Sequence, residues 1–424
     1  MQHIKIIPST LQGTIHIPPS KSLSHRAVIA AGLADGLSRI ENLLHSDDIA
    51  VTCKAMESFG IKMDKVGNSL QIQGSNTLEV YNSEIDCLES GSTLRFMIPI
   101  ALLTGKKVSF HGRGQLRTRP LDTYFNIFKQ QNISYEYPGH LPLTVNGNLK
   151  PGDFQVEGDV SSQFITGLLF TLPLLDGDSR IMMTSPLESK GYVDLTLDIL
   201  IRYSINIQHD EYKTFYIKGN QKYKAADYRV EGDYSQAAFW IVAGTLGGEI
   251  DCVDLNEKSF QGDSVIVDIV KKMGGSLSIE NNKVKVRPSK TRGMTVDASQ
   301  CPDIVPILTV LAALSEGKTE IINAARLRIK ESDRLKAMAT ELNKLGANVL
   351  EQADGLVIHG TDTLKGGVVD SWNDHRIAMA LAIASIRCTE PVVITNSHAV
   401  SKSYPGFFQD FKEVGGKYHE WYMG

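Results

Sequence analysis

Apolar and polar positions follow a pattern that recurs six times along this chain. Each copy has a short polar opening, about three turns of almost wholly apolar sequence, and a turn before a short run of β-forming residues. "KSLSHRAVIAAGL" and "DHRIAMALAIA" are two examples. The polar openings lie about 70 residues apart, at Ser22, Ser92, Ser162, Ser235, Asp303 and Asp374. Each copy predicts a buried helix followed by a strand.

A second kind of helix is predicted between these segments. Five stretches have an amphipathic pattern that changes into alternating strand residues, at 48–63, 121–137, 193–208, 263–280 and 334–352. A repeat of this length can carry a small core, so six copies predict stacked βαβ-type units, three in each of two domains. The apolar helices should lie inside each domain with sheets outside them, and their polar openings should meet on one face.

The best point at which to divide the chain follows the third copy. "YRVEGD" at 228–233 matches "FQVEGD" at 154–159, which itself precedes a helix opening. We therefore expect an N-terminal domain of residues 19–230 and a C-terminal domain made of residues 1–18 plus 231–424. The hinge between them is expected near 18–20 and 228–233.

Composition places the chain among ordinary globular proteins. Its 424 residues are 42% hydrophobic, and a net charge of −4 gives no general attraction to nucleic acid or anionic membranes. No apolar run approaches the roughly 18 to 20 residues of a membrane span, and the start lacks the pattern of a signal peptide. We therefore expect a cytoplasmic protein whose five scattered cysteines are free thiols. Any affinity for anions must come from local clusters of charge.

Basic residues recur at the helix openings, where the partial positive charge of a helix amino end disfavours them. Hydroxyl and amide side chains accompany them. The basic set is Lys21, Arg26, Arg95, Lys330, Arg334, His375 and Arg376, and the polar set is Ser22, Ser92, Ser161, Ser162, Gln163 and Ser235. Helix amino ends and arginine both bind phosphate and carboxylate oxygens, so the pattern indicates an anion site. Ordinary capping and solvated charge explain any one opening better than they explain the whole set.

A few acidic residues accompany these cations. Because negative charge weakens a site for anions, their presence there requires a chemical explanation. The loops add further cations, Arg113, Arg117, Arg119 and Lys402. Asp303 lies in an apolar segment between prolines, where a carboxylate either caps a helix or serves proton transfer. Glu331 and Asp333 either pair with Lys330 and Arg334 along a helix or belong to the site. These acids therefore have two interpretations, one structural and one catalytic.

Motifs for bound cofactors do not fit the sequence. "ALSEGKTE" imitates the end of a phosphate-binding P-loop, but Ala312 stands where the first glycine is needed and the segment follows a helix. "GRGQLR" lacks the third glycine of a dinucleotide fingerprint, and no metal-ligand spacing occurs. We therefore expect neither a nucleotide cofactor nor a metal.

Six short segments carry a family resemblance: "PPSKSLSHRA", "RPL", "VSSQF", "KESDRL", "NDHRIAMA" and "SKSYPGF". In order and spacing, between residues 18 and 410, they resemble the signature segments of the 5-enolpyruvylshikimate-3-phosphate synthases. These are 3-phosphoshikimate 1-carboxyvinyltransferases of the enolpyruvyl transferase family. The resemblance implies an α/β fold, a two-domain inside-out α/β barrel in which each domain has three βαβαββ-type units. Parallel helices would be buried inside outer sheets, and the protein would be a monomer.

The resemblance also implies an activity, transfer of the enolpyruvyl group of phosphoenolpyruvate to the 5-hydroxyl of shikimate 3-phosphate with release of phosphate. The implied contacts of shikimate 3-phosphate, the substrate of the N-terminal domain, are Lys21, Ser22, Arg26, Ser161, Ser162, Gln163, Ser189, Asp303 and Lys330. The implied contacts of phosphoenolpyruvate, on the C-terminal side, are Lys21, Gly91, Arg119, Gln163, Arg334, Arg376 and Lys402. Tyr192 matches a further site position, although it also suits a packed aromatic.

The chemistry assigns roles within this set. Asp303 is the candidate that accepts the hydroxyl proton, and Glu331 or Lys21 is the candidate that protonates the methylene carbon. The cations stabilise the shifting charge without a metal. The two domains would close on the substrates and exclude water. Lys21 and Arg26 would tolerate the helix opening because substrate oxygens lie between them and the helix end.

Two other functions share some of these features. UDP-N-acetylglucosamine enolpyruvyl transferases share the repeated fold, but they typically carry a reactive cysteine in the loop before the arginine matched here by Arg119, and "GRGQLRTRP" has none. A nucleic-acid-binding repeat protein is a remote alternative, against which the acidic charge balance argues. The chain departs from the family pattern at "ESGSTLR", residues 89–95, and at Arg326, where asparagine is frequent.

Overall fold

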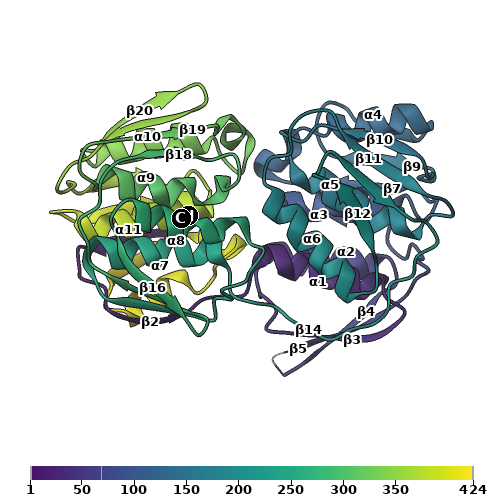
Figure 1. The fold of residues 1–424 in the computed structure, drawn as a ribbon, viewed down its shortest axis with the longest axis horizontal. Coiled ribbons are helices and arrows are strands. Elements are labelled where there is room, and N and C mark those ends of the chain that lie inside the picture. Colours follow the sequence, from purple (N-terminus) through teal and green to yellow (C-terminus); the bar gives the residue numbers. More distant parts are fainter. Residues whose placement is uncertain (1, 68, 423–424) are drawn as a thin grey trace. The chain divides into compact units, whose positions relative to one another are not determined.

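The apolar stretches form the inner helices of two units (Figure 1). The computed structural model describes residues 2–67 and 69–422. The N-terminal unit is Pro19–Val230, and the C-terminal unit is Met1–Pro18 together with Glu231–Gly424. Each unit has its own hydrophobic core. The chain therefore passes between the units at two places, after Pro18 and after Val230.

In the described part of the chain, each unit has three inner helices that are buried on nearly every face. They are α1 (Lys21–Leu33), α3 (Gly91–Ala101) and α5 (Ser162–Thr171) in the N-terminal unit, and α7 (Tyr234–Gly247), α9 (Val305–Ala313) and α11 (His375–Ala384) in the C-terminal unit. Every residue of α9 and α11 is buried. Burying each Leu, Ile, Val or Phe side chain contributes about 1.5–3 kcal/mol, so a helix that is apolar all round belongs in a core.

Three four-stranded sheets, counted over the described residues, cover the helices of the N-terminal unit. Their strand orders are β14 (Tyr228–Arg229), β3 (Gly36–Glu41), β5 (Ser69–Gly74), β4 (Lys62–Val66); β6 (Glu84–Asp86), β7 (Val108–His111), β9 (Leu143–Asn146), β8 (Ser134–Glu136); and β10 (Asp153–Val156), β11 (Ser179–Met183), β13 (Thr214–Ile217), β12 (Ile207–Asp210). The first pair in each sheet is parallel and the others are antiparallel. Along β10, Phe154 and Val156 are buried while Asp153 is exposed, so one face of the sheet covers the core.

The C-terminal unit repeats this arrangement with two strands from the start of the chain. Over the residues described, its sheets are β22 (Gly367–Asp370), β23 (Val392–Thr395), β1 (Gln2–Ile7), β24 (Lys417–Tyr422); β16 (Ser276–Glu280), β17 (Lys283–Arg287), β15 (Ile250–Val253), β2 (Gly13–His16); and β18 (Thr295–Asp297), β19 (Lys318–Ile322), β21 (Gly355–His359), β20 (Asn348–Gln352). β1 pairs with β23 and β24, and β2 pairs in parallel with β15. The first residues therefore complete two repeats of this unit.

The amphipathic stretches form the second helix of each repeat. These helices are α2 (Asp47–Ser58), α4 (Asp122–Gln131), α6 (Lys190–Arg202), α8 (Ile266–Lys272) and α10 (Arg334–Lys344). A sixth, α12 (Phe407–Glu413), was not predicted, because its seven residues follow the loop "SKSYPG" and are too few to show a helical period. With it, each of the six repeats contains an inner and a second helix.

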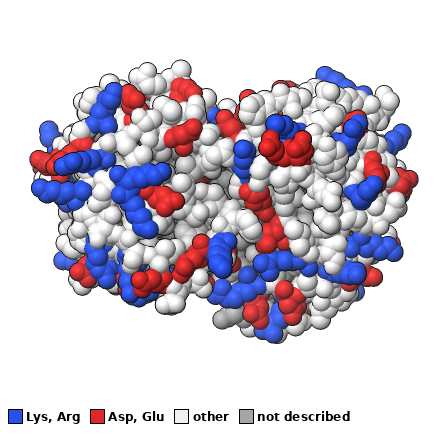
Figure 2. Space-filling view, viewed as in Figure 1, with Lys and Arg blue, Asp and Glu red and all other residues white. Residues whose placement is uncertain are grey.

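These elements confirm the predicted α/β class with repeated βαβαββ units. Within each unit, Figure 1 shows helices on the inside and sheets around them. Among residues 2–67 and 69–422, no helix combines the length and apolar character that a membrane span requires. On the face drawn in Figure 2, basic and acidic side chains are interspersed, unlike the single basic surface of a nucleic-acid-binding face.

Candidate active site

A group of charged side chains surrounds Asp303 in the C-terminal unit. Asp303 lies in a short 3-10 turn, Pro302–Ile304, directly before α9. Its Oδ1 is 3.1 Å from Arg334 Nη1 and 3.6 Å from Lys330 Nζ, and its Oδ2 is 2.9 Å from Arg376 Nη2. The N-cap residue of α9 is Ile304, which makes no side-chain cap hydrogen bond. The Asp303 carboxylate contacts three cations, which favours its interpretation as a site residue.

Arg334, the first residue of α10, is 1% exposed and pairs with three carboxylates. Besides Asp303, its Nη2 donates to Glu331 Oε2 at 2.8 Å and its Nε donates to Asp374 Oδ2 at 2.9 Å. Burial lowers the pKa of Arg334, but Asp374, Glu331 and Asp303 raise it by more, so the pKa lies above its ordinary value. Arg334 therefore keeps its charge inside the protein.

Arg376 joins the openings of the three inner helices of this unit. It lies in the first turn of α11, and its Nη2 donates to Ser235 Oγ of α7 at 3.1 Å and to Asp303 ahead of α9. Lys402, at the end of the 3-10 helix Ser397–Lys402, donates from Nζ to Asn373 O at 2.6 Å, just before α11. The predicted meeting of helix openings is confirmed in this unit.

Lys330 is the third cation that contacts Asp303, and its pKa lies below the ordinary value for lysine. It follows the 3-10 helix η5 (Ala325–Ile329), and its side chain is 24% exposed. Burial lowers the pKa of Lys330 to about 8, although Asp303 acts in the opposite direction. The charge that Lys330 offers to an anion therefore depends on pH.

In the N-terminal unit, the opening of α1 is held by protein groups. Lys21 Nζ is 2.9 Å from Asp48 Oδ2 in the first turn of α2. Arg26 is 3% exposed and makes four hydrogen bonds, to Ser22 O, Thr166 Oγ1, Thr196 Oγ1 and Tyr192 O. Burial lowers the pKa of Arg26 to about 10. Arg26 thus ties α1 to α5 and α6, and its positive charge remains.

The openings of α3 and α5 are joined by Gln163. Its Oε1 accepts a hydrogen bond from Arg95 Nη1 at 2.8 Å, and its Nε2 donates to Ser92 Oγ at 2.9 Å. Ser161 caps α5, where Gln163 N donates to Ser161 Oγ at 3.3 Å, and Ser162 is the first residue of that helix. Five of the predicted residues, Ser92, Arg95, Ser161, Ser162 and Gln163, therefore lie around two adjacent helix openings.

Two further predicted residues lie where the local geometry is restrictive, Gly91 through a close contact and Ser189 through its backbone conformation. A Cβ added at Gly91 would lie 2.7 Å from Arg119 Nη1, so the absence of a side chain lets this guanidinium lie against the opening of α3. Ser189 precedes α6 with φ of 54° and is 2% exposed. Left-handed backbone is costly for serine, so the surrounding structure holds this residue in place.

Several sequence candidates lie outside both groups. Asp333 caps α10 through Lys336 N and pairs with Arg328 at 2.9 Å rather than with the Asp303 group. Arg113 pairs with Asp86 at 2.6 Å on the surface, and Arg117 contacts the ring of His140. Arg326 is buried and donates to Ser299 O. Tyr192, by contrast, adjoins the N-terminal group, because its carbonyl accepts a hydrogen bond from Arg26; it is also partly buried against the core of its unit.

Sequence reasoning missed Asp48 and Asp374 as partners of the cations. The side chain of Asp374 is 0% exposed and that of Asp48 is 12% exposed. Both precede or begin helices, so their only sequence signal was that of an ordinary helix-capping acid. Their pairing with Arg334 and Lys21 appears only in the folded chain.

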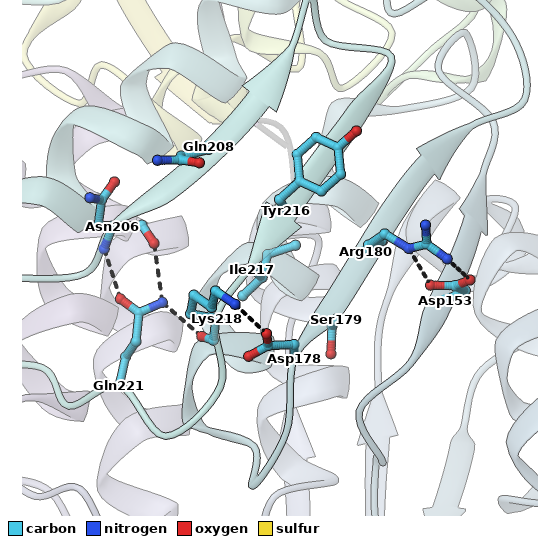
Figure 3. A pocket seen from close by; sticks show the side chains of 10 residues that line it. All are labelled: Asp153, Asp178, Ser179, Arg180, Asn206, Gln208, Tyr216, Ile217, Lys218 and Gln221. Carbon is cyan, nitrogen blue, oxygen red and sulfur yellow. Dashed lines mark hydrogen bonds and ion pairs between the residues drawn. The ribbon is translucent and has the colours of Figure 1, made fainter.

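An open groove of about 630 Å³ lies elsewhere, over the outward face of the β10-β11-β13-β12 sheet (Figure 3). Its charged side chains are already paired, Arg180 with Asp153 and Lys218 with Asp178. None of the predicted site residues lines it. The groove is therefore separate from both groups.

Comparison with known proteins identifies the family. Residues 6–411 match the family described as EPSP synthase (3-phosphoshikimate 1-carboxyvinyltransferase). The chain is 58% identical to the 3-phosphoshikimate 1-carboxyvinyltransferase of Clostridium novyi and 56% identical to that of Clostridium acetobutylicum, with each pair of chains fully covered. In fold it is similar to EPSP synthase from Acinetobacter baumannii (TM-score 0.85, 23% identity, both chains fully covered). It is also similar in fold to the enolpyruvyl transferase NikO from Streptomyces tendae (TM-score 0.82, 16% identity, 100% and 99% covered). The chain belongs to the EPSP synthase (3-phosphoshikimate 1-carboxyvinyltransferase) family.

Proposed function

We propose that the protein transfers the enolpyruvyl group of phosphoenolpyruvate to the 5-hydroxyl of shikimate 3-phosphate and releases phosphate. The observation that carries the proposal is the group around Asp303, in which one carboxylate contacts Arg334, Arg376 and Lys330. Such a group suits a reaction that takes a proton from a hydroxyl while cations hold phosphate and carboxylate charges. Family membership supports this reaction among those that a cationic site could perform.

The cations and the groups around them are proposed to hold phosphoenolpyruvate, which carries a phosphate and a carboxylate. The contacts in the C-terminal unit are Arg334, Arg376 and Lys402, and those in the N-terminal unit are Lys21, Gly91, Arg119 and Gln163. A guanidinium can donate two parallel hydrogen bonds to either anionic group. Because Asp374 and Asn373 O already hold Arg334 and Lys402, these cations are positioned before a substrate arrives.

The acceptor is proposed to bind mainly through the N-terminal unit. Its contacts there are Lys21, Ser22, Arg26, Ser161, Ser162, Gln163 and Ser189, and Asp303 and Lys330 contribute from the C-terminal unit. Hydroxyl and amide groups at helix openings suit a substrate with a phosphate and several hydroxyls. Arg26 has four N–H groups bound within the protein, so its contribution is its charge and the one N–H that remains on Nη1.

The proton transfers follow from the two steps of the reaction. In the addition, the 5-hydroxyl bonds to C2 of phosphoenolpyruvate, Asp303 accepts the hydroxyl proton and a proton is added to C3. In the elimination, the C2–phosphate bond breaks and C3 loses a proton, which leaves the enolpyruvyl ether and free phosphate. The Lys21 ammonium has a proton to give, whereas Glu331 accepts a hydrogen bond from Arg334 and suits removal of the C3 proton.

Phosphate release from phosphoenolpyruvate tests the activity. The assay runs in parallel with shikimate 3-phosphate and with UDP-N-acetylglucosamine as acceptor, and release only with the first is expected. Asp303→Asn should lower turnover about 10²- to 10⁴-fold, since it removes the proton acceptor. Glu320→Gln, which breaks an exposed pair with Lys318 in the same unit, is the matched control and should keep full activity. Release only with UDP-N-acetylglucosamine would overturn the acceptor, and an Asp303→Asn variant within tenfold of the parent would overturn its role.

Replacement of Lys21 tests the second assignment. Lys21→Met should lower turnover by at least about 10²-fold while the melting temperature changes by only a few degrees. Lys107→Met is the control, because Lys107 forms an exposed pair with Glu136 in the same unit. Turnover unchanged by Lys21→Met would remove Lys21 from the site. A cytoplasmic location and a monomeric state are also proposed, and size-exclusion chromatography with light scattering tests the second of these.

A further inference from the structure

A strained turn lies between β22 and α11. Trp372 and Asn373 have φ angles of 55° and 52°. Two consecutive residues in the left-handed region are uncommon without glycine, and a tryptophan there is strongly disfavoured. Such a conformation persists only where the surrounding groups impose it.

Glu341 provides one of these groups. It lies on α10 and is 1% exposed. Its Oε1 accepts a hydrogen bond from Trp372 Nε1 at 2.8 Å, and its Oε2 accepts one from Asp370 N at 3.0 Å. Lys344 Nζ contacts both oxygens, at 3.0 and 2.8 Å. This buried carboxylate accepts four hydrogen bonds from three donor groups, and two of those groups belong to the turn and the strand that leads into it.

Asp370 and Ser371 support the turn from within. Trp372 N donates to Asp370 Oδ1 at 2.6 Å, and Asn373 N donates to Ser371 Oγ at 3.2 Å. Asp374 N donates to Ser371 O at 2.9 Å. These bonds fix the local path of the chain. Glu341 is the group that connects this path to another helix.

The turn bears on three cations proposed to bind phosphoenolpyruvate. Arg376 follows it in the first turn of α11, and Lys402 Nζ donates to the carbonyl of Asn373 at 2.6 Å. Asp374, the next residue, accepts from Arg334 Nε at 2.9 Å. Displacement of the turn would therefore move the contacts of all three cations together.

Side chains of helix α10 bind both ends of the segment 370–374. Arg334 and Glu341 are seven residues apart, which is close to two helical turns, so both side chains lie on one face of α10. Arg334 holds Asp374 after the turn, and Glu341 holds Asp370 N and Trp372 before and within it. We propose that Glu341 is a positioning residue for the phosphoenolpyruvate contacts, acting through the Trp372 indole and the strained turn. This inference rests on the proposed function.

Glu341→Gln is the first test, because glutamine keeps the shape but presents an NH₂ to one of the two donors of the turn. The loss of one hydrogen bond to a buried carboxylate predicts a rise of about tenfold in KM for phosphoenolpyruvate. The KM for shikimate 3-phosphate should stay within about twofold, since none of its proposed contacts lies on the turn. Lys344→Met is the matched control, because it removes a partner of Glu341 that is 47% exposed and leaves the turn bonded. That variant should keep both KM values.

Trp372→Phe tests whether Glu341 acts through the indole N–H or only through the general stability of the protein. It removes the indole N–H and keeps an aromatic ring, so it should also raise KM for phosphoenolpyruvate selectively. If Glu341 acts through the indole, the double variant should be no worse than Glu341→Gln alone. A rise in both KM values, an unchanged KM for phosphoenolpyruvate in a folded variant, or strictly additive effects would overturn the inference.

Hydrogen exchange tests the role of Glu341 separately from the proposed enzymatic activity. Amides of a peptide that spans Asp370 to Arg376 should exchange faster in Glu341→Gln than in the parent, whether or not the protein is active. Unchanged exchange would overturn the role of Glu341 even in an active enzyme. A parent protein that releases no phosphate with shikimate 3-phosphate would refute the proposed function, while faster exchange would still establish that Glu341 holds the turn.

Discussion

Asp374→Asn is the substitution that tests most directly how the buried cations are held. Asp374 and Arg334 are 0% and 1% exposed, and the carboxylate also accepts from Ser332 Oγ at 3.0 Å and from Arg376 N at 2.9 Å. Asparagine keeps the shape and caps a helix about as well as aspartate. The substitution therefore removes one negative charge beside a buried guanidinium, and it also places an amide NH₂ where one carboxylate oxygen accepts hydrogen bonds.

The magnitude follows from the partners that remain. Breaking a buried ion pair by removing one member costs about 3–5 kcal/mol. Because Arg334 still contacts Glu331 at 2.8 Å and Asp303 at 3.1 Å, we expect the lower end of that range, about 3 kcal/mol. For a unit of this size, each 1 kcal/mol lowers the melting temperature by roughly 2–4 °C, so the expected loss is about 6–12 °C.

Scanning calorimetry and urea unfolding measure this loss, with Glu320→Gln as the control. Glu320 pairs with Lys318 at the surface, so its substitution should change the free energy of unfolding by less than about 0.5 kcal/mol. A decrease in melting temperature below about 2 °C for Asp374→Asn would refute the argument. It would mean that Glu331 and Asp303 alone stabilise the Arg334 charge.

Two further predictions concern pH. Burial, with smaller contributions from Lys21 and Arg26, lowers the pKa of His25 well below 6.5, so the unfolded chain takes up a proton there that the folded chain does not. Stability should therefore be full above pH 6.5 and fall below it by up to about 1.4 kcal/mol per pH unit, and urea unfolding at pH 7.5 and 5.5 should show a smaller fall in His25→Asn than in the parent. Lys330, with a pKa of about 8, loses its charge as pH rises through that value, so KM for shikimate 3-phosphate should rise about tenfold per pH unit above it. Lys330→Arg should flatten this profile, and an unchanged profile would remove Lys330 from the acceptor site.

The inner helices could be predicted from the sequence because their signal is local. A stretch that is apolar on every face has one stable location, and α9 and α11 are buried at every residue. Strand pairing is not local in this way. Alternation in β1 and β2 shows which side chains face a core, but it does not show that β1 pairs with β23 and β2 with β15, both far along the chain.

In the candidate site too, features with a local sequence signal could be predicted and non-local contacts could not. Basic residues at helix openings stand out in the sequence because they contradict the helix dipole. Their partners give no such signal: Asp374 is a common type of cap, and Thr166 and Thr196, which accept hydrogen bonds from Arg26, are ordinary hydroxyl residues within α5 and α6. The sequence can therefore predict that such a cation belongs to a site. Its partner becomes known only from the folded structure, in which distant segments pack together.

The protein partners also change the explanation for cations at helix openings. The sequence suggested that substrate oxygens let Lys21 and Arg26 tolerate the end of α1, but Asp48, two threonines and two carbonyls already hold them. In the C-terminal unit, Asp303, Glu331 and Asp374 do the same for Arg334 and Arg376. An anionic substrate must therefore compete with these carboxylates, so the binding free energy is the difference between two sets of ion pairs. The carboxylates therefore lower the affinity for the substrate but hold the cations in fixed positions. Charges that are already in position stabilise a transition state in which charge moves.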